Sequence, residues 1–191
     1  MKMQTENQEK YEESQSRRIR AEFEKYVTSK QSLMIATINE NNMPDASYAP
    51  FVVDDKFNVF ILVSDIVERT RNLIANGKAS LLFIEDESSC KHIFARKRVT
   101  MQANAKLVQI NDSKLQDLQK LFHNKFGEFV NLEIINKSDF HLIEMRPLEA
   151  SLTKGFGLAY RLTGSKLEQV EHLKKGHTSR ENQKDNLNGA A

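Results

Sequence analysis

The sequence predicts a mainly β fold with helical insertions, built on an antiparallel barrel that is closed or half-closed. Short apolar or alternating runs, separated by turn-forming residues, predict a series of strands. Helical segments are missing between most of these runs, whereas a parallel βαβ sheet requires them. An antiparallel α+β architecture therefore fits the pattern best.

An amphipathic helix is expected over residues 9–30, because Ile19, Phe23, Tyr26 and Val27 share one helical stripe. Two further helices are expected over 66–77 and 111–127. The expected strands span 32–38, 46–53, 58–64, 79–85, 98–110, 139–145, 149–155 and 158–164. The chain therefore divides into the amino-terminal helix packed on the barrel (1–30), the barrel (31–164), and a carboxyl-terminal loop and disordered tail (165–191).

The composition predicts one cytoplasmic globular domain. The chain has 191 residues, 39% of them hydrophobic, which suits a single core. Its single cysteine excludes a disulfide framework and a multi-cysteine zinc site. No apolar run approaches the roughly 18 residues of a membrane span. The first residues lack the apolar region of a signal peptide.

The net charge of +2 conceals an uneven distribution. Residues 88–111 carry five cations and no acid, and the acidic run 85–87 lies directly before them. The segment KHIFARKR (91–98) places Arg96, Lys97 and Arg98 beside apolar residues, which suits a flat anionic ligand. A solvated strand end remains the simpler interpretation. Nucleic acid is disfavoured, because the cluster is short and no RNA-reading aromatic motif accompanies it.

Two histidines are candidates for a site. His177 lies in a polar stretch near the carboxyl terminus, where it is either solvated or an axial ligand to an iron porphyrin. Such a ligand needs a carboxylate or carbonyl partner to fix its tautomer. His141 alternates with Asp139 on one strand face, which makes Asp139 either partly buried or an edge residue beside a turn. No Walker loop, dinucleotide fingerprint or nucleophile elbow is present.

Three segments resemble the pyridoxamine 5′-phosphate oxidase-like superfamily: residues 33–64, 68–87 and 94–108. A narrower resemblance is to the HugZ/HutZ-type haem-utilisation proteins, on the motifs SYAPFV, IEDE, FARKR, KFGE, KGFGLAY and LKKGH. Together these cover about residues 17–180. The resemblance implies an antiparallel split β-barrel that works as a homodimer.

The resemblance also implies a site. His177 would be the axial ligand of the haem iron, and Asp139 would be its hydrogen-bond partner across the dimer. Arg96 and Arg98, with Lys97 between them, fall where the family holds the porphyrin or its propionates. The implied reaction is oxidative haem degradation with O₂ and an electron donor, either a reductase or a small reductant, with release of iron. Haem would be both substrate and cofactor.

Two alternatives remain open: an FMN-dependent oxidoreductase of the same fold, and a haem storage or trafficking protein without turnover. FMN is disfavoured, because Glu68 stands beside Arg69 where flavin-binding relatives place cations for the phosphate. No membrane partner is expected.

Overall fold

The computed structural model describes residues 2–109, 115–128, 130–132 and 139–173. The helices are α1 (Lys2–Thr28), α2 (Glu68–Asn76) and α3 (Leu115–Phe126), with two short 3₁₀ turns, η1 (Glu87–Ser89) and η2 (Ile93–Ala95). The strands are β1 (Ser32–Ile38), β2 (Pro44–Pro50), β3 (Val52–Val53), β4 (Val59–Ser64), β5 (Lys78–Ile84), β6 (Arg98–Leu107), β7 (Phe140–Gly155), β8 (Leu158–Thr163) and β9 (Gln169–His172).

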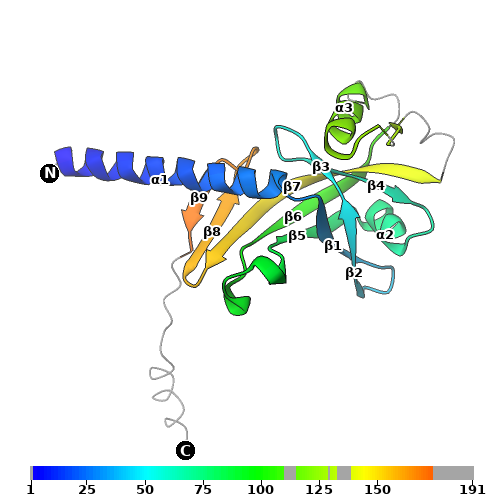
Figure 1. The fold of residues 1–191 in the computed structure, drawn as a ribbon, viewed down its shortest axis with the longest axis horizontal. Coiled ribbons are helices and arrows are strands. Elements are labelled where there is room, and N and C mark those ends of the chain that lie inside the picture. The colour runs from blue at the N-terminus through cyan, green and yellow to red at the C-terminus, as the bar shows by residue number, and fades with distance from the viewer. Residues whose placement is uncertain (1, 110–114, 129, 133–138, 174–191) are drawn as a thin grey trace, which may run out of the picture.

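One antiparallel sheet organises the described chain, in the order β2-β1-β5-β6-β7-β4-β3. β8 pairs with the end of β7, and β9 pairs with β8. The sheet curls so that β2 approaches β4, and α2 packs near that end (Figure 1). The predicted mainly β, half-closed antiparallel barrel is therefore confirmed.

The barrel interior follows from simple alternation along its strands. On β1, Leu33 and Ile35 point inward, as do Leu81 and Phe83 on β5 and Val99 on β6. Alternate residues on the same strands face outward and are half-buried or, like Met34, exposed. Because side chains alternate along a strand, this pattern fixes which face carries any external site.

Helix α1 closes one side of the barrel. Ile19, Phe23 and Val27 are buried in the main core, and the Phe23 ring lies 5.2 Å from that of Phe57. The stripe predicted from the sequence is thus the buried face. Figure 1 shows the amino-terminal half of α1 extending past β9 and beyond the sheet. α3 covers a second core cluster with Leu118 and Phe122.

The structure differs from the sequence prediction in three elements. The single strand expected over 46–53 is two strands, because β2 pairs with β1 whereas Val52 and Val53 of β3 pair with β4 at the opposite end of the sheet order. β7 is continuous where a break at Arg146-Pro147 was expected, because a register shift between Gln102 and Ala103 of β6 accommodates the proline. β9 was not predicted, since its four residues contain one half-buried apolar side chain, Val170. No helix among the described residues is long and apolar enough to cross a membrane.

Candidate functional site

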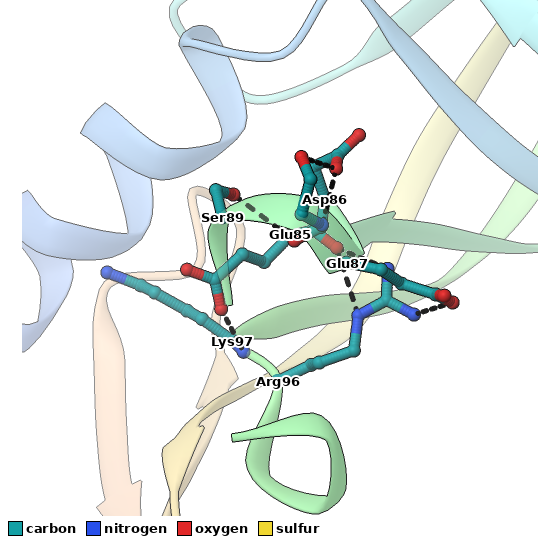
Figure 2. A network of polar contacts seen from close by, with 7 residues as sticks. Glu85, Asp86, Glu87, Ser89, Arg96 and Lys97 are labelled. Carbon is teal, nitrogen blue, oxygen red and sulfur yellow. Dashed lines mark hydrogen bonds and ion pairs between the residues drawn. The ribbon is translucent and has the colours of Figure 1, made fainter. Parts of the chain in front are cut away.

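The connection between β5 and β6 carries the basic segment singled out in the sequence. It folds into η1 and η2, with Asp86 capping η1 by accepting a hydrogen bond from the Ser88 N–H at 2.8 Å. The backbone N–H of Glu85 donates to the carbonyl of Lys97 at 2.9 Å. The acidic run and the cationic run therefore lie against each other at the base of the loop (Figure 2).

Arg96 holds this loop together. Its Nε donates to the Glu85 carbonyl at 3.0 Å, and one terminal nitrogen donates to Glu87 Oε1 at 2.8 Å. The other terminal nitrogen also donates to the Glu85 carbonyl. A guanidinium has five N–H groups, so two remain for a ligand. Arg96 therefore clamps the loop and can donate at most two further hydrogen bonds to a ligand.

Lys97 turns toward α1. Its Nζ donates to Glu22 Oε1 at 2.5 Å and lies 4.9 Å from the centroid of the Tyr26 ring. The Tyr26 hydroxyl donates to the Lys97 carbonyl at 2.7 Å, and burial raises the pKa of Tyr26 to about 12. Glu22 also pairs with Lys154 at 2.5 Å. The ammonium of Lys97 is thus already engaged by a carboxylate.

Arg98 is the least committed cation of the three. Its only described hydrogen bond runs from one terminal nitrogen to the Arg96 carbonyl at 3.1 Å, and no carboxylate of the described residues pairs with it. It lies across the sheet from Ile84 of β5. Four N–H groups of its guanidinium are therefore available to an anion.

A groove of about 400 Å³ opens beside this segment on the outer face of the barrel. Its apolar wall is formed by Met34, Tyr48, Leu82 and Ile84. Its polar end includes the side chains of Lys30, Asp86 and Arg96. The volume lies within the roughly 300–1,000 Å³ typical of small-molecule sites. The groove joins an apolar surface to a charged edge.

Asp139 lies at the other end of the sheet, directly before β7. Its side chain is exposed, and its Oδ2 accepts a hydrogen bond from the Ser64 hydroxyl at 2.7 Å. Next to it, His141 Nε2 lies 2.5 Å from Asp65 Oδ1. The partly buried environment considered for Asp139 was wrong, because the strand begins only at the following residue.

Asp139 and the basic segment do not meet within one chain. Arg98 pairs with Thr153 near the far end of β7, whereas Asp139 directly precedes that strand. At about 3.3 Å per residue, roughly 45 Å of strand separates the two positions. A ligand that contacts both must therefore receive them from two copies of the chain.

His177 lies outside the described residues. The described chain leads toward it through His172 of β9, whose ring stacks on Tyr160 with centroids 4.8 Å apart. Sequence reasoning missed Ser64 and Glu22. Ser64 is 75 positions from its partner Asp139, and Glu22 looked like one of many solvated acids on a polar helix.

The residues after β4 do not fit the phosphate of FMN. The guanidinium of Arg69 is turned toward β2, where one terminal nitrogen donates to the Tyr48 carbonyl at 2.6 Å. Its Nε is buried without a partner among the described residues. Glu68 is exposed and accepts from Asn39 at 3.3 Å. An incoming phosphate would meet a carboxylate where it needs a cation.

Comparison with known proteins gives consistent results. The family model described as pyridoxamine 5′-phosphate oxidase matches residues 19–154. The chain is 34% identical over 160 residues to a protein named heme oxygenase HutZ, from Vibrio cholerae, covering 84% of this chain and 90% of that protein.

Two solved structures have similar folds. Campylobacter jejuni ChuZ superposes with a TM-score of 0.70 at 28% identity, over 81% of this chain and 62% of the ChuZ chain. A structure of Vibrio cholerae HutZ, described as a heme storage protein, gives 0.58 at 33% identity, over 66% of this chain and 88% of that one. The chain thus belongs to the pyridoxamine 5′-phosphate oxidase family and, within it, to the group that contains HutZ.

Proposed function

We propose that this chain is a cytoplasmic, dimeric haem-binding protein that degrades haem with O₂ and an electron donor and releases the iron. The observation that carries the proposal is the 34% identity to heme oxygenase HutZ along 90% of that protein. The groove beside the basic segment supplies matching chemistry. A porphyrin is flat and apolar with two anionic propionates. The groove has an apolar wall and a charged end, where Lys30 and Arg96 stand beside Glu85 and Asp86.

The three cations of the basic segment take different parts in this proposal. Arg98 does not itself line the groove, but it lies across the sheet from Ile84 of the groove wall. It pairs with a propionate, because most of its N–H groups are uncommitted. Arg96 lines the groove and keeps the loop in shape, so it acts on the ligand directly and through the loop. Lys97 contributes positive charge while its salt bridge to Glu22 anchors the segment on α1.

His177 is the proposed axial ligand of the haem iron, and Asp139 of the partner copy is its hydrogen-bond acceptor. An acceptor on Nδ1–H fixes the tautomer that presents Nε2 to iron and raises the donor strength of the imidazole. The separation of Asp139 from Arg98 along β7 supports a site shared by two copies. A two-fold symmetric pair would bring the Asp139 end of one copy to the basic segment of the other.

The outer face of the barrel supports the dimer. It exposes apolar side chains from β1, β2 and β7, including Met34, Tyr48 and Leu148. Contiguous exposed apolar surface marks interaction sites on proteins. A second copy seated on this face would also cover the open groove and limit access of water to a ligand bound there.

Bound haem, as substrate, supplies the redox chemistry with O₂ and external electrons. The chain's own residues bind the haem iron, orient the ring and neutralise the propionates. His177 holds the ring by its iron, Asp139 holds the imidazole proton, and Arg98 and Arg96 fix the propionate edge. These contacts together fix the orientation of the ring, and therefore which of its edges faces the protein.

Haem storage without turnover is the second candidate, and it is favoured by the description of the Vibrio cholerae HutZ structure as a storage protein. An FMN-dependent oxidoreductase has less support, since Arg69 is turned toward β2 and the exposed Glu68 stands in the segment where flavin-binding relatives place cations.

Spectroscopic titration with haemin tests the binding proposal. Wild-type protein should give a histidine-ligated spectrum that saturates at one haem per chain, and His177→Ala should lose it. Unchanged affinity and spectrum in His177→Ala would contradict the assignment. Purified protein with flavin absorbance and no response to haemin would favour the flavoprotein.

A further inference from the structure

Ser64 lies where β4, β7 and the start of α2 meet. Its backbone is fixed there, because its carbonyl accepts from Thr70 Oγ1 at 2.6 Å and from the Val67 N–H at 3.2 Å. The Thr70 side chain that makes the first of these bonds is fully buried. The position of Ser64 is therefore set by the fold rather than by its own side chain.

The Ser64 hydroxyl has a defined direction. Its oxygen accepts from the Ile66 N–H at 3.3 Å, and the hydroxyl lies 2.7 Å from Asp139 Oδ2. A carboxylate can only accept, so the hydroxyl proton points at Asp139. Ser64 thus joins the segment leading into α2 to the carboxylate that precedes β7.

Ser64 is the only described side-chain anchor of Asp139. The Asp139 carbonyl is also held, because it accepts from the Asp65 N–H at 2.8 Å. The neighbouring carboxylate of Asp65 is engaged with His141 at 2.5 Å and does not compete for the Ser64 hydroxyl. With Oδ2 bound, Oδ1 of Asp139 has no partner among the described residues and can accept one further donor.

We infer that Ser64 is a positioning residue for Asp139: it holds Oδ2 so that Oδ1 is presented to the imidazole N–H of the partner copy's axial histidine. The inference rests on the proposed function, in which Asp139 is the partner of His177. The carboxylate is exposed, so without this hydrogen bond its side chain rotates among several rotamers in water. The hydrogen bond to the imidazole then forms only part of the time.

Resonance Raman spectroscopy of the ferrous haem complex tests this, because the iron–histidine stretching frequency reports the strength of the hydrogen bond on the imidazole. Asp139→Asn should lower the frequency, since an amide oxygen is a weaker acceptor than a carboxylate. Ser64→Ala should lower it by part of that amount, and Ser64→Thr, which retains a hydroxyl, should restore it. Thr28→Ala is the matched control, because it deletes a hydroxyl that donates at 2.8 Å to Glu24 O on α1.

The outcomes separate the two levels of the proposal. No shift in Asp139→Asn would overturn the Asp139–His177 pair and this inference with it. A shift in Asp139→Asn with none in Ser64→Ala, or with an upward shift there, would overturn the role of Ser64 alone. If Ser64→Ala does not fold, Ser64→Cys takes its place, and its weaker donor should still lower the frequency.

Discussion

The ammonium of Lys97 donates a hydrogen bond of 2.5 Å to Glu22 of α1, which ties the basic segment to the amino-terminal helix. Lys154 at the end of β7 binds the other oxygen of the same carboxylate at 2.5 Å. One glutamate therefore connects α1, the loop before β6 and the end of β7. This connection holds in place the end of the barrel that carries Arg96 and Arg98.

Glu22→Gln should lower the free energy of unfolding by about 1–2 kcal/mol at pH 7, because it weakens two charge-assisted hydrogen bonds. Burial raises the pKa of Glu22, but the hydrogen bonds from Lys154 and Lys97 outweigh it, so the pKa lies below its ordinary 4.5. A lowered pKa stabilises the fold above pH 4.5, and this contribution is lost as the pH falls through the folded-state value.

Urea denaturation of both proteins from pH 7 to pH 3 measures this difference. It should be largest at pH 7 and shrink below pH 4.5. Glu24→Gln is the control, because Glu24 is itself exposed and makes a single i,i+4 pair with Arg20 on the same helix, worth about 0.5 kcal/mol or less. Equal effects of the two substitutions would contradict a special role for Glu22.

Arg98→Ala should weaken haemin binding roughly 10- to 100-fold, the loss of one charge-assisted pair with a propionate. Arg98→Lys keeps the charge and should recover part of that loss.

Arg96→Lys should behave differently: a single ammonium cannot hold both Glu85 and Glu87, so the loop loosens in the haem-free protein as well. Hydrogen exchange of residues 85–98 measures that loosening, and unchanged exchange in Arg96→Lys would contradict the clamp.

Lys125→Met should stabilise the fold at pH 7. Lys125 Nζ lies 3.6 Å from the centroid of the Phe51 ring, and burial lowers the pKa of Lys125 to about 8. Between pH 8 and the ordinary 10.5 the unfolded chain binds more protons than the folded one, so wild-type stability should rise with pH relative to Lys125→Met. Thermal unfolding across this range measures the difference in stability between the wild type and Lys125→Met. Lys120→Met controls for loss of a surface charge on α3. A stability difference between the wild type and Lys125→Met that stays constant above pH 8 would show that Lys125 is ordinarily solvated.

Mixed dimers test whether the site is shared between copies. In a dimer of one His177→Ala chain and one Asp139→Asn chain, a shared arrangement leaves one site with both residues intact. The mixed dimer is isolated by co-expression with two purification tags. About half of its sites should show the wild-type iron–histidine frequency, by simple counting of sites. The two mutant homodimers, which contain no intact site, are the controls. No recovery in the mixed dimer would place both residues of each site within one chain.

Most strands and helices could be predicted because they carry a strong local signal, whereas β9 does not. The alternation of Leu33 and Ile35 and the stripe of Leu118 and Phe122 are legible in the sequence, and both are core residues in the structure. The helix expected over 66–77 is α2, which ends at Asn76 and is followed by Gly77 in the left-handed region that favours glycine.

The site was harder to predict from the sequence, because its contacts join distant parts of the chain. The sequence pointed to Arg96, Lys97 and Arg98 as a group, but tertiary contacts give each a different partner: the Glu85 carbonyl, Glu22 and the Arg96 carbonyl. Ser64 follows an apolar strand and shows no pattern of its own, so only folding reveals its bond to Asp139. His177 remains a prediction from the resemblance.

Aerobic turnover of the haem complex tests the central claim most directly. The complex is incubated with ascorbate in air, with catalase present and a ferrous chelator to report released iron. Haem degradation predicts loss of the Soret band together with ferrous iron, surviving the catalase and strongly reduced in Asp139→Asn. A Soret band that persists, or whose loss catalase abolishes, would contradict enzymatic degradation and leave haem storage as the function.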